Sequence, residues 1–171
     1  MEKKAKIKAP ARATHMVKNL TMNGAASQDD LVRCPWACLD PLSRAYHDLR
    51  WGRPCRDDQE LFKMLILEGQ QAGLSWPLIL KKERAILSAF EGLEPKKVAE
   101  FGERKVEELM ANPEIIRNRL KIKAAITNAR VFLALVKEKG SFADYLWAFV
   151  DNEPIVNHWR EMQELPANSD L

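Results

Sequence analysis

The sequence predicts an all-α fold, an irregular bundle of several mostly short helices. Three observations predict it. Apolar residues recur at helical spacing from Leu31 onward, no segment alternates as a half-buried strand does, and Pro, Gly and capping residues divide the chain into short stretches. The 171 residues are enough for one domain with a sizeable core. We expect this domain over residues 31–171, after a disordered basic tail at 1–30.

The first well-marked helix begins at Asp57, because Asp57 and Glu60 form a capping-box-like pair, and it runs to about Gln71. Ser75 and Pro77 suit the cap and first turn of a second helix. That helix ends near residue 90, before a glycine at 92. The remaining helical segments are expected, in order, over 95–101, 103–111, 113–118 (a single turn), 120–139, 141–150 and 158–164.

The longest of these helices, 120–139, has one continuous apolar face, as expected for a helix packed against a core. The residues of this face are Ile122, Ala125, Ile126, Ala129, Phe132, Leu133 and Val136.

The charge of the chain limits its possible partners. The net charge is +3, and residues 1–30 carry all of that excess, so the domain itself is neutral overall. Any binding of a polyanion must therefore use a local patch. No apolar run approaches a membrane-spanning length, and the N-terminus has no apolar block typical of a secretory signal. Three cysteines do not suggest a disulfide framework, so we expect the cytoplasm or another reducing compartment.

Residues 67–76, LEGQQAGLSW, end an apolar helix with polar and aromatic groups that a core does not require. Glu68 is expected to meet an apolar wall, Gly73 permits a turn that other residues resist, and Trp76 offers a flat stacking surface. A carboxylate beside an aromatic ring suits a flat, electron-poor ligand such as a nucleobase. The alternative is a solvated glutamate, the usual state of this residue on a helix.

Aromatic residues gather around the preceding segment, at Trp36, Tyr46 and Trp51, together with Trp76. Such a cluster is usually part of a core, but here Pro and Gly turns flank it, which also fits a concave aromatic pocket. Both interpretations remain open from the residues alone.

Cys34 and His47 are possible zinc ligands, thirteen residues apart, but a zinc site needs four. Cys38 and Cys55 could complete a local set, although the resulting spacing matches no common zinc motif. Taken alone, this pattern favours cysteines that serve as small packing residues or free thiols.

Four cationic residues lie at the entry to the long helix, two just before it and two near its start: Arg117, Arg119, Lys121 and Lys123. A helix N-terminus already favours phosphate through its free N–H groups, so these cations could hold a DNA backbone. They could equally form a solvated face.

Several of these motifs together resemble the DNA-3-methyladenine glycosylase I family. The blocks that carry the resemblance are RCPW (33–36), DPL (40–42), AYHD (45–48), WG (51–52), LEGQQAGLSW (67–76), LKK (80–82), EIIRNRLKIKAAITNAR (114–130) and FADYLWAFV (142–150). The resemblance extends from Cys34 to about Leu171. It implies the helix-hairpin-helix glycosylase fold, hydrolysis of the N-glycosidic bond of 3-methyladenine in alkylated DNA, and a role in base-excision repair.

The resemblance also implies roles for single residues. Glu68 would hydrogen-bond the flipped base and Tyr46 would add a polar contact, while Trp76 and Trp36 would supply aromatic surfaces. The turn formed by Gln71, Ala72, Gly73 and Leu74 would fill the gap that the flipped nucleotide leaves in the DNA. Cys34 and His47 would be two of the four ligands of a structural zinc ion.

The chain departs from the family pattern at its C-terminal end. Family members continue into a Gly-rich hairpin that grips the DNA backbone and into two further zinc ligands. In this chain His158 is the only histidine after His47, and no cysteine follows Cys55. We therefore expect a C-terminally truncated family member with only half of the zinc site, and with reduced DNA affinity, stability and activity.

Three functional hypotheses follow. The first is a monomeric 3-methyladenine glycosylase that acts on double-stranded alkylated DNA, away from any membrane. The second is a non-catalytic protein that binds DNA or the alkylated base. The third is a pseudoenzyme without a function of its own. Release of free 3-methyladenine distinguishes the first hypothesis from the others.

Overall fold

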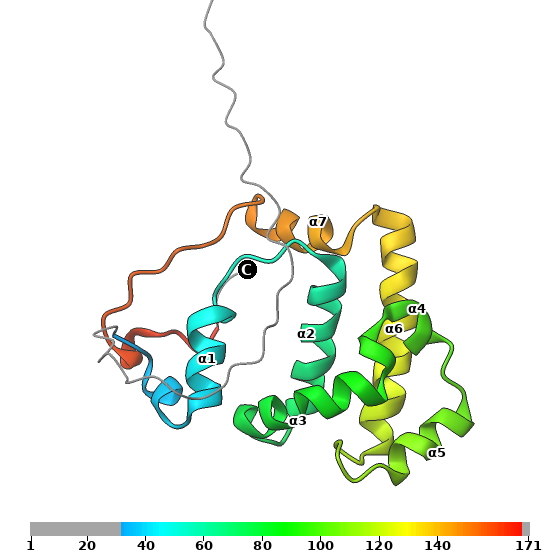
Figure 1. Cartoon of the computed structure of the whole chain (residues 1–171). Helices are drawn as coiled ribbons and strands as arrows, with labels where there is room; N and C mark the ends of the chain where they lie inside the picture. The colour runs from blue at the N-terminus through cyan, green and yellow to red at the C-terminus, as the bar shows by residue number, and fades with distance from the viewer. Residues whose placement is uncertain (1–31, 169–171) are drawn as a thin grey trace, which may run out of the picture. The chain divides into compact units, whose positions relative to one another are not determined.

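The computed structural model describes residues 32–168, and all regular structure within that range is helical, which confirms the all-α prediction (Figure 1). The predicted tail at 1–30 lies outside the described residues. Between 32 and 168 the elements are η1 (Pro35–Cys38), α1 (Pro41–Leu49), α2 (Asp58–Gln71), α3 (Trp76–Ala89), η2 (Glu91–Leu93), α4 (Pro95–Ala99), α5 (Glu103–Ala111), α6 (Arg119–Lys139), α7 (Phe142–Trp147), η3 (Ala148–Val150) and η4 (Met162–Glu164), where η denotes a 3₁₀ helix.

The predicted helix starts are confirmed where a cap or a proline marked them. The carboxylate of Asp57 accepts a hydrogen bond from the backbone N–H of Glu60, 2.9 Å away, which is the N-cap half of a capping box, while the Glu60 carboxylate pairs with Lys63. Ser75 occupies the N-cap position of α3, and Pro77 lies in its first turn. The predicted helix at 103–111 has the same first and last residues as α5.

Two predicted helical segments are wrong. Residues 113–118 form a turn and an irregular stretch, because the side-chain oxygen of Asn112 accepts from the N–H of Glu114 (2.9 Å) and closes a non-helical turn. The segment 158–164 contains only the short helix η4, and its residues with a described side chain are exposed. Without an apolar face to bury, so short a helix is not stable.

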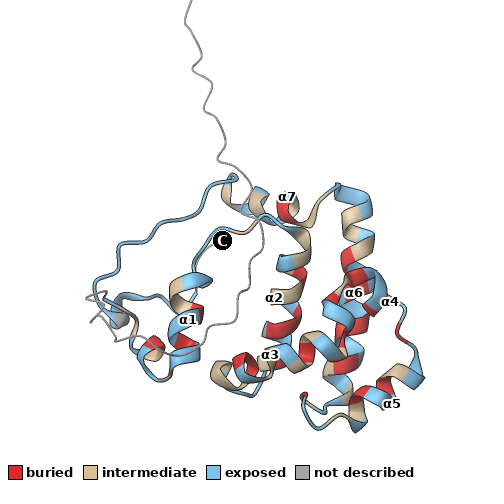
Figure 2. Ribbon diagram, in the orientation of Figure 1, coloured by how far each residue is buried: buried red, intermediate tan, exposed pale blue. Residues whose placement is uncertain are grey.

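The core is built around α6, which contacts α2, α4, α5 and α7. Its predicted apolar face is confirmed: five of the seven residues are buried, and Leu133 and Val136 pack against the core with partial exposure. Figure 2 shows the buried residues of α2, α3 and α6 where these helices face one another. The structure therefore places α2 and its polar C-terminal end on a well-packed support.

Helix α1 packs against η1 and α3 rather than on α6. Its N-cap is Asp40, whose carboxylate accepts from the N–H groups of Leu42 (2.9 Å) and Ser43 (3.0 Å). Tyr46 and Ser43 are buried on its inner face, outside the main core cluster. This helix carries several of the predicted site residues to the start of α3.

Asp58, the first residue of α2, also caps α7. Its carboxylate accepts hydrogen bonds from Ser141 Oγ (3.1 Å) and from the backbone N–H groups of Phe142 (3.1 Å) and Ala143 (2.7 Å). Burial raises the pKa of the Asp58 carboxyl, but these hydrogen bonds outweigh it and hold the pKa below its ordinary value. One carboxylate thus joins two helices that are far apart in sequence.

Replacing Asp58 by alanine is expected to lower the free energy of unfolding at pH 7 by about 1–2 kcal/mol, because the N-terminal N–H groups of α7 lose their acceptor. Since the pKa is depressed in the folded state, the stabilisation is present above the ordinary aspartate pKa of about 4 and is lost as the pH falls below it. Urea denaturation at pH 7 and pH 3 should show a smaller difference from the unsubstituted chain at pH 3. The exposed Asp144→Ala serves as the control on α7. An equal loss at both pH values would contradict the prediction.

No helix among residues 32–168 is long and apolar enough to cross a membrane.

Candidate functional site

The predicted aromatic residues lie together. The ring centroid of Tyr46 is 5.2 Å from that of Trp76 and 6.3 Å from that of Trp36, and Trp36 lies 5.3 Å from Trp51 in an edge-to-face arrangement. These four side chains come from η1, α1, the loop after α1 and the first residue of α3. Tyr46 is therefore held between two indoles, with its ring buried and its position fixed from both sides.

Glu68 lies close enough to Tyr46 to affect its ionisation. Burial raises the pKa of the Tyr46 phenol, and the negative charge of Glu68 raises it further. The phenol is consequently protonated at neutral pH and can donate a hydrogen bond.

The expectation that Glu68 meets an apolar wall is wrong, because the residue is exposed. The buried positions of α2 are Phe62, Ile66, Leu67 and Gln70, and Glu68 lies on the exposed side of the helix. Its carboxylate thus lies at the surface, close enough to the aromatic cluster to act on the phenol of Tyr46.

Trp76 has an unsatisfied donor. Its indole Nε1 is buried and, within the described part of the chain, is the single buried side-chain nitrogen or oxygen without a hydrogen-bond partner. A buried indole N–H usually finds an acceptor. The structure therefore places a donor without a partner at the edge of the cluster formed with Tyr46.

The turn between α2 and α3 lies at the protein surface. Ala72, Gly73 and Leu74 are exposed, and Gly73 has φ +75°, a conformation that other residues adopt at a cost. The N–H of Leu74 donates to the carbonyl of Gln71 over 2.6 Å and closes the turn. The predicted intercalating segment is thus a tight, exposed turn with an apolar side chain at its end.

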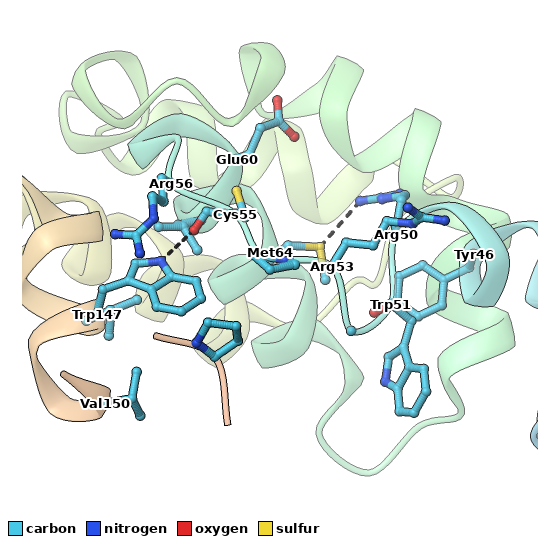
Figure 3. A pocket seen from close by; sticks show the side chains of 15 residues that line it. Tyr46, Arg50, Trp51, Arg53, Cys55, Arg56, Glu60, Met64, Trp147 and Val150 are labelled. Carbon is cyan, nitrogen blue, oxygen red and sulfur yellow. Dashed lines mark hydrogen bonds between the residues drawn. The ribbon is translucent and has the colours of Figure 1, made fainter. Parts of the chain in front are cut away.

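A cleft of about 780 Å³ opens beside Tyr46 and Trp51 and extends toward α7 (Figure 3). The guanidinium of Arg56 lies over the ring of Trp147, 4.3 Å from its centroid. The indole N–H of Trp147 donates to the carbonyl of Cys55 (2.7 Å), which fixes the far wall of the cleft. The other lining residues are Arg50, Gly52, Arg53, Pro54, Glu60, Leu61, Met64, Leu146, Val150 and Pro154.

Not every predicted site residue borders this cleft. Tyr46 lines it, but Glu68, Trp76 and Trp36 do not. The structure therefore brings the predicted base-binding residues together around Tyr46 without enclosing them in a single cavity.

Comparison with known proteins identifies the family. The family model described as methyladenine glycosylase matches residues 36–171. This chain belongs to the methyladenine glycosylase family. It is 40% identical over 140 residues to the DNA-3-methyladenine glycosylase of Haemophilus influenzae, covering 82% of the chain and 76% of the relative. It is 44% identical over 139 residues to DNA-3-methyladenine glycosylase 1 of Escherichia coli, covering 81% and 74%.

Solved structures of the methyladenine glycosylase family have the same fold. A crystal structure of 3-methyladenine DNA glycosylase I superposes with a TM-score of 0.78 at 44% identity, over 81% of this chain and 76% of that one. A tyrosine-to-phenylalanine variant of such an enzyme, in complex with 3-methyladenine, gives a TM-score of 0.77 at 36% identity, over 80% and 74%. The all-α fold of this chain is therefore that of the methyladenine glycosylases.

The cationic cluster of this family member is largely occupied by protein groups. Arg119 pairs with Glu103 (3.1 Å) and Glu107 (2.6 Å), and Lys123 pairs with Glu103 (3.1 Å). Lys121 donates instead to backbone carbonyls at the end of α2. Of the two interpretations of this cluster, the structure favours an ion-paired face over a free phosphate-binding patch.

Sequence analysis missed Arg50, which lies one helical turn after Tyr46. Its guanidinium stands over the Tyr46 ring (5.6 Å to the centroid) and donates to Glu83 (2.8 Å) and to the sulfur of Met64 (3.3 Å). The spacing of four residues on one helix was the available signal. Arg50 connects α1 to α3 and holds the tyrosine from its remaining side.

Asp48 organises the segment around His47. Arg33 donates to both carboxylate oxygens of Asp48 (2.9–3.0 Å), and His47 Nδ1 lies 2.9 Å from one of them. The Arg33 guanidinium, followed by the His47 ring, lowers the pKa of Asp48 to about 2. The His47 ring also stacks on Trp51 (5.4 Å between centroids). No sequence pattern predicted this network.

The residues that the structure describes do not complete a zinc site. Between residues 32 and 168, no group of three or more Cys, His, Asp or Glu side chains is close enough to hold a metal ion. Cys34 stands at the N-cap of η1 and Cys38 one turn later. Four-coordinate zinc does not fit this donor set.

Proposed function

We propose that this chain excises 3-methyladenine from alkylated double-stranded DNA by hydrolysing its N-glycosidic bond. The observation that carries the proposal is the arrangement around Tyr46, a buried phenol between Trp36 and Trp76 beside the charged Glu68. The relatives named above and the solved relative that holds 3-methyladenine support it. We also assign the fold to the helix-hairpin-helix glycosylase superfamily.

The charge of the substrate explains why this arrangement suits it. Alkylation at N3 gives the adenine of the nucleotide a positive charge and makes it a good leaving group. The protein then has to select and orient the base more than it has to protonate it. The Glu68 carboxylate and the faces of Trp76 and Trp36 favour a cation over neutral adenine. Tyr46, protonated because of its raised pKa, can donate a hydrogen bond to the base or to Glu68.

The base must leave the duplex to reach these groups, and the turn at 71–74 can support that step. A flipped nucleotide leaves a gap in the base stack, and unstacking costs a few kcal/mol. Leu74, exposed at the end of the tight turn, is apolar and can occupy the gap.

The test is release of free 3-methyladenine from methylated duplex DNA, separated by chromatography after incubation with the purified chain. Release faster than the spontaneous rate in a protein-free sample supports the proposal, and unmethylated DNA controls for nonspecific release. A folded chain that binds methylated DNA but releases no base would overturn it and support the non-catalytic binding hypothesis.

We propose separately that Cys34 and His47, as two ligands alone, do not hold a structural zinc ion tightly. Because the described residues supply no third ligand, we expect the purified chain to hold less than one zinc per molecule after dialysis. Elemental analysis by mass spectrometry measures this directly, with the double substitution of both ligands as the control. One tightly held zinc per chain would contradict the expectation.

We further propose that the chain acts as a monomer in a reducing compartment such as the cytoplasm. Its three cysteines, Cys34, Cys38 and Cys55, are all free thiols, as that environment requires. Sedimentation of the purified chain tests the oligomeric state.

A further inference from the structure

Lys121 joins α6 to the turn that is proposed to enter the DNA. Its ammonium group donates hydrogen bonds to the backbone carbonyl oxygens of Gln70 and Ala72, each 2.7 Å away. Gln70 lies in the last turn of α2, and Ala72 is the C-cap residue. The two bonds therefore hold the end of α2 and the start of the turn to a residue of the first turn of α6.

The environment of Lys121 differs from that of the other cations near it. Arg119 and Lys123 pair with acidic residues of α5, whereas no described carboxylate lies within ion-pair distance of the Lys121 ammonium. The last carbonyls of a helix lack intrahelical partners and carry partial negative charge, which a lysine can satisfy. The Lys121 ammonium thus interacts with backbone carbonyls at the start of the turn and not with an acidic side chain.

Side-chain packing alone does not fix this turn. Ala72, Gly73 and Leu74 are exposed, so few neighbouring atoms restrain them. A cavity of about 60 Å³ lies between α2 and α6, bordered by Gln70 and Lys121. The two hydrogen bonds from Lys121 therefore supply directional contacts between the start of the turn and α6.

We propose that Lys121 is a positioning residue for base excision. It fixes the position and direction of the turn at 71–74, so that the turn fills the gap in the base stack while the flipped base contacts Glu68. This inference rests on the proposed function. It requires Lys121 to act through the turn and not through the base, because its ammonium group donates to the backbone carbonyls of Gln70 and Ala72. Loss of Lys121 should consequently impair excision from duplex DNA without changing affinity for the free base.

The experiment compares the unsubstituted chain with Lys121→Met in two assays. Single-turnover release of 3-methyladenine from methylated duplex DNA is expected to slow by about tenfold or more, because a small displacement of a positioning element has effects of that order. The dissociation constant of free 3-methyladenine, measured by quenching of tryptophan fluorescence, is expected to stay the same. With single-stranded methylated DNA, in which base flipping leaves no gap in a duplex, the rate of release should fall less than it does with duplex DNA.

Two further variants make the comparison specific. Lys121→Arg retains donors and charge and is expected to recover most of the duplex rate. Lys123→Met removes the same charge two residues further along α6; because Lys123 pairs with Glu103 and not with the turn at 71–74, this variant is expected to excise normally. An equal decrease in the duplex rate for Lys121→Met and Lys123→Met would show that only the loss of positive charge matters, and would overturn the proposal. Weaker binding of free 3-methyladenine by Lys121→Met would also overturn it.

Hydrogen–deuterium exchange tests the positioning role without reference to activity. In the unbound chain, Lys121→Met should speed exchange in the segment 70–76 and leave α5 unchanged. Unchanged exchange in 70–76 would overturn the inference. If the unsubstituted chain released no base, the proposed function would fail, and the exchange result would still decide whether Lys121 holds the turn.

Discussion

Replacing Glu68 by glutamine is expected to slow single-turnover release of 3-methyladenine by about a hundredfold or more, which is the order of loss when a single electrostatic contact to a reacting group is removed. Glutamine keeps the size of the side chain and its hydrogen-bonding capacity but removes the charge that favours a cationic base. The phenol of Tyr46 loses its negative neighbour at the same time, so its pKa is expected to fall toward its ordinary value. Base release from methylated duplex DNA measures the rate, and titration of the tyrosine absorbance measures the pKa.

The exposure of Glu68 makes this experiment easy to interpret. Since the side chain contributes nothing to the core, the melting temperature of Glu68→Gln should match that of the unsubstituted chain. Glu138→Gln is the matched control: it makes the same change near the end of α6, where the carboxylate pairs with Lys139. A Glu68→Gln chain that excised at the full rate would show that the carboxylate does not act on the base.

Local signals in the sequence were sufficient to predict most of the fold. Asp57, Pro77 and Gly140 mark helix ends by satisfying or restricting the backbone near them, and the structure places the ends of α2, α3 and α6 at or next to these residues. The apolar period of α6 likewise predicted its buried face. These features depend on neighbours within one or two turns, which a sequence displays directly.

Features that depend on distant residues were not predictable in this way. The segment 158–164 has helical composition but no surface to pack on, and only the folded chain reveals that difference. Arg33 pairs with Asp48, and Asp58 caps α7. In both cases the partners are far apart in the sequence, and no sequence motif relates them. Local propensity is a weak constraint, and tertiary contacts decide such cases.

The candidate site combines both kinds of information. The motif at 67–76 located Glu68, the turn and Trp76 from sequence, and the structure joins Trp76 to Tyr46 of α1. The burial of Glu68 was predicted wrongly, because an apolar run before a residue does not reveal which side of the helix that residue occupies at the end of the packed region. The side of the helix matters chemically, because a carboxylate at the surface carries its charge without a desolvation cost and can attract a cationic base.

Replacing Phe62 by alanine is expected to have the largest effect on stability, a decrease of about 3–5 kcal/mol in the free energy of unfolding. Phe62 is fully buried on α2, and its ring lies 4.9 Å from that of Phe132 on α6, which in turn lies 4.8 Å from Phe142 on α7. Alanine would leave a cavity where three helices meet, and the loss is comparable with much of the total stability of a domain, about 5–15 kcal/mol. Urea denaturation followed by circular dichroism gives the value.

Leu65→Ala is the control on the same helix, since Leu65 is 41% exposed and its loss is expected to cost less than about 1 kcal/mol. Similar losses in the two variants would contradict the prediction and show that the contact between α2 and α6 is not the centre of the core. A large loss restricted to Phe62→Ala has a functional consequence, because α2 carries both Glu68 and the turn at 71–74. At temperatures below its own unfolding transition, the Phe62→Ala chain should still excise 3-methyladenine. It should lose that activity together with its helical signal on warming, whereas Glu68→Gln is expected to be slow while still folded.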